Sequence, residues 1–183
     1  WKEQAPRAAY SLASALFETG RDLEAVEVLE DLVSEHPMSP VSALAVMRLA
    51  DRALEEGRYG EAASMFERAA GDYREESLRE RALSRLITAT VLAGEDRRAL
   101  EAAERYLELF PGAAGRGSAY RAGMDAAARL QMPGKAVSMI DDWRAESGRA
   151  DSTGAVSLER ARLLRGMGER EKALEETARF RRT

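Results

Sequence analysis

Apolar residues recur three and four positions apart along most of the chain, and polar residues occupy the positions between them. This spacing places the apolar side chains on one face of an α-helix, and strand-like alternation is nowhere sustained. The pattern therefore predicts an all-α protein built from amphipathic helices. It is clearest at Leu12, Leu16, Val26, Leu29, Leu32 and Val33, and again at Leu83, Leu86 and Ile87.

A second pattern has a period of 37 residues and runs through the whole sequence without insertion. A glycine recurs at this interval, replaced once by glutamine, and an alanine follows five positions later each time. Glycine tolerates the left-handed backbone that ends a helix, and alanine lets a second helix approach the first closely. Each motif thus predicts a tight turn between two packed helices. The positions are Gly20, Gly57, Gly94, Gln131 and Gly168, with Ala25, Ala62, Ala99, Ala136 and Ala173.

Other residues predict where the helices begin and end. Ser39 followed by Pro40 is typical of a helix N-cap with proline at the first helical position. Ser77 with Glu80 three positions later predicts a capping box. Pro37 and Pro111 lie at equivalent places in the repeat and predict the joints between successive helix pairs.

These residues resemble the tetratricopeptide repeat, whose two-helix unit has glycine at its turn, alanine in its second helix and proline at its end. The resemblance implies a right-handed α-solenoid of five helix pairs forming one domain over residues 1–183. The expected repeats are 5–38, 40–76, 77–113, 116–150 and 152–183. Matching residues include Leu12, Ala13, Leu16, Gly20, Ala25, Leu29 and Pro37 in the first unit, and Leu49, Ala50, Gly57, Ala62, Phe66 and Ala69 in the second.

The pitch of 37 residues and the joints after Pro37 and Pro111 are similar to a bacterial envelope subgroup of these proteins. That subgroup includes the TolA-binding periplasmic protein and the lipoprotein of the outer-membrane barrel-assembly machine. The resemblance implies a periplasmic scaffold, while a cytoplasmic location stays open. Because the chain begins at Trp1 and not at methionine, we expect it to be a fragment of a longer protein.

The composition removes several classes of function. Lys and Arg total 28 against 32 Asp and Glu, so the net charge of −4 indicates no general attraction to nucleic acid. No run approaches the roughly 18 apolar residues that cross a bilayer, so we expect no membrane insertion by this segment. The absence of cysteine excludes disulfides, thiolate catalysis and cysteine-based metal sites.

Catalytic and cofactor motifs are also missing. His36 is the only histidine and has no serine or cysteine placed to form a nucleophilic pair, which argues against catalysis and against a transition-metal site. Gly112, Gly115 and Gly117 lack the preceding strand and following Gly-Lys-Ser/Thr of a phosphate loop, so we interpret them as an inter-repeat loop. Adjacent acids such as Asp141 and Asp142 point about 100° apart on a helix and are interpreted as solvated surface. We therefore expect no enzyme activity, no cofactor and no metal.

The family resemblance also implies a binding groove, lined on its concave side by the first helix of each pair. The implied positions are apolar towards the N-terminus and rich in arginine towards the C-terminus, which suggests a protein or peptide partner with an apolar part and an acidic part. Ordinary packing of the apolar residues and solvation of the arginines is the competing interpretation. The candidate groove residues are Tyr10, Phe17, Met47, Asp51, Arg81, Arg121, Asp125, Arg129 and Arg162.

The leading interpretation of function is a protein-binding scaffold in a bacterial cell-envelope assembly. Two alternatives remain open: a self-associating module, since an uncapped solenoid end exposes apolar surface, and a recruitment or regulatory domain of a larger enzyme. The chain has no asparagine, which argues against the carboxylate clamp that chaperone-binding members of the family use.

Overall fold

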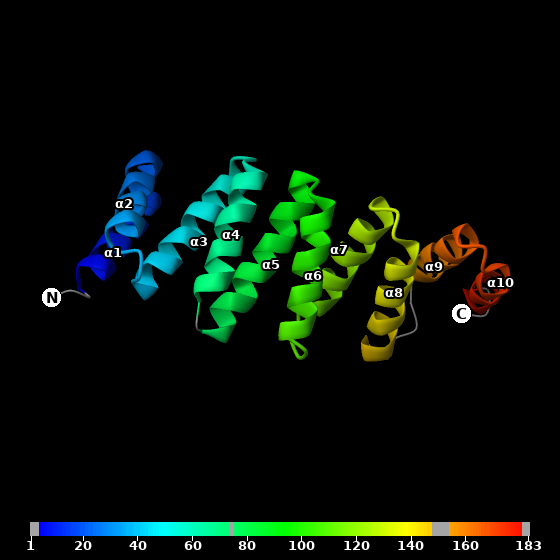
Figure 1. Cartoon of the computed structure of the whole chain (residues 1–183). Coiled ribbons are helices and arrows are strands. Elements are labelled where there is room, and N and C mark those ends of the chain that lie inside the picture. Colours follow the sequence, from blue (N-terminus) through cyan, green and yellow to red (C-terminus); the bar gives the residue numbers. More distant parts are fainter. Residues whose placement is uncertain (1–3, 74, 148–153, 181–183) are drawn as a thin grey trace. The chain divides into compact units, whose positions relative to one another are not determined.

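The computed structural model describes residues 4–73, 75–147 and 154–180, and this part of the chain is helical throughout, with short turns (Figure 1). The helices follow one another in pairs, and the described residues form no strand. The predicted all-α fold of tandem helix pairs is therefore confirmed. The helices are α1 (Gln4–Glu18), α2 (Asp22–Glu35), α3 (Pro40–Glu55), α4 (Tyr59–Asp72), α5 (Glu76–Ala93), α6 (Asp96–Leu109), α7 (Arg116–Arg129), α8 (Pro133–Ser147), α9 (Ala155–Gly166) and α10 (Arg170–Phe180).

The helices gather into two compact units, residues 1–93 and 94–183. In the first unit α3 packs against both α1 and α2, and α5 packs against α4. In the second unit α6 packs against α7, α7 against α8, α8 against α9, and α9 against α10. Within each unit, then, every helix packs against the one that follows it. The prediction that all five pairs form a single domain stays a prediction.

The turns inside the pairs have the backbone that the 37-residue pattern predicts. Gly20, Gly57, Gly94 and Gly168 all have positive φ, from 70° to 85°. Gln131, at the position where the pattern departs from glycine, also has a positive φ of 58°. The N–H of Arg21 donates to the Leu16 carbonyl at 2.9 Å, five residues back, which is the bond that closes a Schellman turn. The same bond follows Gly57, Gln131 and Gly168.

The repeated alanines lie in the core, as predicted. Ala25, Ala62, Ala99 and Ala136 are fully buried, and Ala173 is nearly so. One apolar cluster in the first unit joins α1, α2 and α3 around Leu29 and Leu32, and another in the second unit surrounds Tyr120 and Met139. Small side chains at the turn thus let the two helices of a pair meet closely while larger ones fill the joint to the next pair.

The two predicted helix starts have different outcomes. Ser39 is the N-cap of α3, its Oγ accepting from the N–H of Val41 at 3.3 Å, with Pro40 as the first helical residue. The capping box at Ser77 and Glu80 is wrong, because α5 already begins at Glu76 and the Ser77 Oγ donates to the Glu75 carboxylate at 2.7 Å. A side chain inside the first turn cannot serve as the cap that precedes it.

The glycine-rich segment before α7 is a joint, as predicted, and one of its glycines has a packing reason. A Cβ at Gly115 would come within 3.1 Å of Cζ of Tyr106, a buried residue of α6, and closer still to its hydroxyl. A side chain at this position would push the Tyr106 ring out of its place, so glycine lets the loop lie directly against it.

Candidate functional site

In the first unit the apolar candidates lie close to the core. Tyr10 and Phe17 of α1 are half-buried and pack against the cluster of α1, α2 and α3. The guanidinium of Arg48 lies 5.0 Å from the centre of the Phe17 ring, a cation–π contact that covers part of it. Met47 is only 6% exposed, so it offers no free apolar surface in this structure. The apolar part of the candidate surface is therefore smaller than the sequence suggests.

The polar candidates of the first unit pair with one another across two first helices. Asp51 of α3 lies 3.7 Å from Nη2 of Arg81 and 3.3 Å from Nε of Arg85, both on α5. Asp51 is largely buried, whereas Arg81 is mostly exposed. The two arginines of α5 thus neutralise the Asp51 carboxylate within the first unit. Because both arginine side chains are still exposed, each can also bind an anion from outside the chain.

In the second unit three candidates are exposed on α7, namely Arg121, Asp125 and Arg129. Nε of Arg129 donates to Oδ1 of Asp96 on α6 at 2.5 Å. Within the described part of the chain, Arg121 and Asp125 form no ion pair. Arg121 is therefore the candidate cation of this unit whose charge is least neutralised by its surroundings.

Arg162 lies at the border of a groove between α9 and α10, which we call the end slot. The groove has a volume of about 580 Å³. Arg162 is 76% exposed and pairs only loosely with Glu159 of its own helix, at 3.8 Å. The side chains that line the end slot include Leu158, Arg162, Arg165, Arg170, Leu174 and Thr177.

Sequence reasoning missed a cluster centred on Arg116, at the start of α7. Its Nε donates to Oε2 of Glu146 on α8 at 2.8 Å, and its Nη1 donates to the carbonyls of Leu107 and Phe110 at the end of α6. The hydroxyl of Tyr120 donates to the same Glu146 at 2.7 Å. Burial raises the pKa of Tyr120 to about 12, and its hydrogen bond to Glu146 adds to the effect. One arginine thus links three helices of the second unit.

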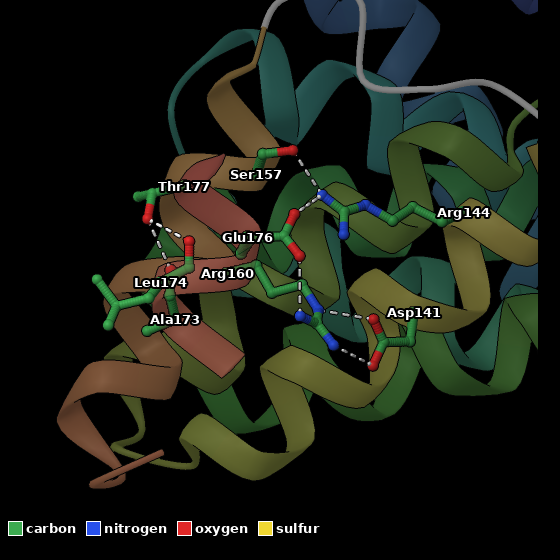
Figure 2. A network of polar contacts seen from close by, with 8 residues as sticks. All are labelled: Asp141, Arg144, Ser157, Arg160, Ala173, Leu174, Glu176 and Thr177. Atoms are coloured by element: carbon green, nitrogen blue, oxygen red, sulfur yellow. Dashed lines mark hydrogen bonds and ion pairs between the residues drawn. The ribbon is translucent and has the colours of Figure 1, made fainter. Parts of the chain in front are cut away.

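A second missed cluster holds α10 against α8 and α9 (Figure 2). Glu176 accepts from Nη2 of Arg144 at 2.6 Å and from Nη1 of Arg160 at 2.9 Å. Arg160 also donates to both carboxylate oxygens of Asp141, at 2.7 and 3.1 Å. Asp141 is exposed at the helix surface, as predicted, and is also ion-paired. Partners 16 to 32 residues apart carry no local sequence signal that could have revealed them.

The described residues contain no group of three or more potential metal ligands of the His, Cys, Asp and Glu types. Nor does any helix in the described ranges have the length and apolarity that crossing a membrane requires. The surfaces that remain as candidates are therefore the exposed first-helix residues and the end slot.

Comparison with known proteins identifies the repeat. Residues 7–39 match the family model of the tetratricopeptide repeat. A comparison with curated protein sequences finds no match.

Solved structures resemble the chain over most of its length. A structure of MamA protein is 12% identical with a TM-score of 0.68, covering 96% of this chain and 89% of that one. YrrB, described as a TPR protein with an unusual peptide-binding site, is 18% identical with a TM-score of 0.65, covering 92% and 80%. The kinesin light chain-type TPR-like repeats of Podosopora anserina are 22% identical with a TM-score of 0.61, covering 96% and 92%. Residues 7–39 are therefore a tetratricopeptide repeat, and the chain as a whole has the fold of tetratricopeptide-repeat proteins.

Proposed function

We propose that this chain is a non-catalytic scaffold that binds protein or peptide segments on the exposed faces of the first helices within its units. The observation that carries the proposal is the exposed charge on these helices, above all Arg121 on α7, which forms no ion pair with any described residue. Helical repeats of this kind commonly present extended surfaces to partner segments.

The distribution of charge supports an acidic segment as the ligand of the second unit. Arg121 is exposed without an ion pair among the described residues, and Arg129 remains about half exposed beside Asp96. Arginine forms bidentate hydrogen bonds with carboxylates, which suits it to this role. On the first unit, the Phe17 ring and Tyr10 supply a small apolar contact next to Arg48. The peptide-binding site described for YrrB fits a function of this kind.

Site-specific photocrosslinking in the native organism tests the proposal directly. A photoreactive amino acid is placed at Thr88 on α5 and at Arg121 on α7, both exposed on first helices, and at Arg105, exposed on the second helix α6. We expect protein adducts at Thr88 and Arg121 but not at Arg105. Adducts at all three positions alike, or only at Arg105, would show that the first-helix face is not the binding surface.

Charge reversal then tests the acidic segment. Once a crosslinked partner is identified, Arg121→Glu should weaken its binding several-fold at low salt, and the weakening should shrink as the ionic strength rises. Arg105→Glu is the matched control, because it reverses a charge that is also exposed but lies on a second helix. Unchanged affinity of the Arg121→Glu variant would overturn the acidic-segment proposal and leave the scaffold proposal standing.

We further propose that the scaffold acts in a bacterial cell envelope. The basis is the 37-residue pitch and the proline-containing joints, which are similar to envelope members of the family. Fractionation of cells that express the tagged full-length gene is the test. Recovery of the protein in the periplasmic or membrane fraction would support the envelope location, and recovery with cytoplasmic markers would contradict it.

A further inference from the structure

A groove of about 460 Å³ lies between α2 and α4 in the first unit, with α3 as its floor. α3 packs against both of these helices, while α1 packs against α2 and α5 against α4. The groove is therefore internal to the first unit, with described helices before and after the three that form it. We call it the α2–α4 groove, and the lining residues used here are Glu30, Val33, Val46, Leu49, Met65 and Arg68.

The repeat brings three of these positions together, as the last two pairs demonstrate. There Glu176 accepts hydrogen bonds from Arg144 at 2.6 Å and from Arg160 at 2.9 Å (Figure 2). The side chains at these positions thus meet where α8, α9 and α10 join. Three repeats earlier, the residues at the positions of Arg144, Arg160 and Glu176 are Val33, Leu49 and Met65. The site that is an ionic network in the last joint is therefore apolar in the α2–α4 groove.

Packing explains why this apolar site is open. In the second unit Met139 of α8 is 3% exposed, because its terminal atoms lie beside Gly123 of α7, where no side chain competes for the space. Two repeats earlier Leu49 stands in place of that glycine. Its side chain occupies the space in the joint, so Met65, the counterpart of Met139, stays partly exposed at the border of the groove.

The second unit also bridges this joint with an ion pair that the first unit lacks. Lys135 of α8 pairs with Glu104 of α6. Two repeats earlier the same positions hold Glu61 of α4 and Glu30 of α2, which are both acidic. Glu61 pairs with Arg58 of its own turn, and Glu30 forms no ion pair with any described residue. An unpaired carboxylate therefore lies at the border of an open apolar groove.

The charge beside the groove differs between its two sides. α2 carries acidic residues along its whole length and contains no lysine or arginine. Glu27 and Glu30, three residues apart and so on one side of the helix, are exposed and form no ion pair within the described ranges. On the α4 side, Arg68 pairs with Asp72 at 3.5 Å. Cations of a ligand are therefore attracted to α2 and repelled by Arg68.

We propose that the α2–α4 groove binds a basic amphipathic segment of a partner protein. An apolar side chain of the segment would lie against Val46 and Met65, and its lysines or arginines would meet Glu27 and Glu30. Charge selects this occupant, because an acidic segment would face the unpaired carboxylates of α2. The groove opens between second helices, so the proposal goes beyond the first-helix face and does not depend on binding there.

The test uses two capped helical peptides that differ only in the sign of their charge. Each has a stripe of leucine flanked by lysine in the basic peptide or by glutamate in the acidic one, with alanine elsewhere. Fluorescence anisotropy at low salt should show the intact chain binding the basic peptide on the order of tenfold more tightly than the acidic one. Replacing the leucines of the basic peptide with serine should remove most of this binding, because the contact with the apolar floor is lost.

Changes in the protein locate this binding in the groove. Glu27→Lys with Glu30→Lys should reverse the peptide preference. Glu61→Lys introduces the pair that bridges the joint in the second unit, and it should weaken binding of the basic peptide several-fold. Glu18→Lys makes the same change of charge at an exposed position of α1, and this matched control should change the affinity little. Arg68→Gln should strengthen binding, because it removes the repelling cation. Circular dichroism establishes that each variant is folded.

Three results would overturn the proposal. The first is equal binding of the two peptides, or no binding up to about millimolar concentration. The second is a preference that the Glu27 and Glu30 changes leave intact, or an equal loss in Glu61→Lys and Glu18→Lys.

The third is evidence for another occupant of the groove. Self-association in light scattering that Glu27→Lys with Glu30→Lys abolishes would assign the groove to a second copy. Peptide binding that the present chain shows and the full-length gene product lacks would assign it to another segment of the same protein. Because the variants leave Arg121 and Arg129 unchanged, none of these results bears on the first-helix face.

Discussion

Glu176 of α10 accepts a hydrogen bond of 2.6 Å from Nη2 of Arg144 on α8, although its carboxylate is only 3% exposed. Arg160 of α9 holds the other carboxylate oxygen at 2.9 Å (Figure 2). A carboxylate is stable in such a place only when its charge is met on both sides. The last helix pair is therefore joined to α8 by charge as well as by apolar packing.

Neutralising Glu176 should loosen α10. Glu176→Gln leaves two partly buried cations, Arg144 and Arg160, facing an amide. We expect the opening free energy of α10 to fall by about 2 kcal/mol, less than for a fully buried pair because both arginines are partly exposed. Hydrogen exchange of α10 amides is the measurement. Glu175→Gln, one residue earlier and exposed, is the control. Equal protection in both variants would show that the network contributes nothing to holding α10.

The same carboxylate predicts a dependence on pH. Burial by itself would raise the pKa of Glu176, but hydrogen bonds and charge from Arg144, with contributions from Ser157 and Arg160, hold the pKa below its usual value of 4.5. A lowered pKa stabilises the folded state above the unfolded value, and this contribution is lost as pH falls through the folded pKa. Protection of α10 should therefore decrease below about pH 4.5 in the native chain and change less in Glu176→Gln. Parallel profiles would contradict this assignment.

Gln131 offers a test of backbone strain. Its φ of 58° is one that side chains disfavour, while Gly94 has a φ of 70° at the same repeat position. An added Cβ at Gly94 would meet nothing within 4 Å, so a substitution there changes only the backbone cost. We expect Gln131→Gly to raise the free energy of unfolding by about 0.5–1 kcal/mol and Gly94→Gln to lower it by a similar amount. Urea denaturation of both variants measures this, and changes of the same sign would refute the explanation.

The Gln131 turn also shows why the fold could be predicted and much of the site could not. The 37-residue register constrains local backbone, so it predicted a tight turn at Gln131 as well, and the structure adds that this turn is left-handed although glycine is missing. It could not predict exposure at one repeat position, since Met47 is buried whereas Arg121, at the equivalent place, is exposed. Exposure there depends on the volumes of side chains from neighbouring helices. Pairs such as Arg116 and Glu146 join residues 30 apart and become visible only once the helices are packed.

Arg116 should contribute more to stability than its ionic partner does. It bonds the carbonyls of Leu107 and Phe110 as well as Glu146, and its side chain is only 13% exposed. Arg116→Met should therefore lower the free energy of unfolding by about 2 kcal/mol, whereas Glu146→Gln, at a more exposed carboxylate, should cost less than about 1 kcal/mol. Thermal and urea denaturation compare the two. Equal losses would mean that the ion pair, and not the carbonyl bonds, is the main contribution.

A substitution at Gly123 of α7 tests whether close packing or helix propensity decides stability at this position. The two effects predict changes of opposite sign in the free energy of unfolding. It lies in mid-helix, where alanine ordinarily stabilises by about 0.5–1 kcal/mol relative to glycine. A Cβ at this position, however, would lie 2.3 Å from Cε and 3.0 Å from Sδ of Met139 on α8, and 3.3 Å from Cβ of Ala103 on α6. We therefore expect Gly123→Ala to lower the free energy of unfolding by about 1–2 kcal/mol, because the methionine must move out of its place in the core.

A double-mutant cycle with Met139 tests this cause. Met139→Ala alone should be destabilising, because it leaves a cavity beside Gly123. If the two side chains compete for one space, the Gly123→Ala substitution should cost little or even stabilise when Met139 is alanine, so that the double variant loses less than the sum of the single ones. Additive losses would place the strain elsewhere, since the terminal atoms of Met139 come closest to the added methyl group.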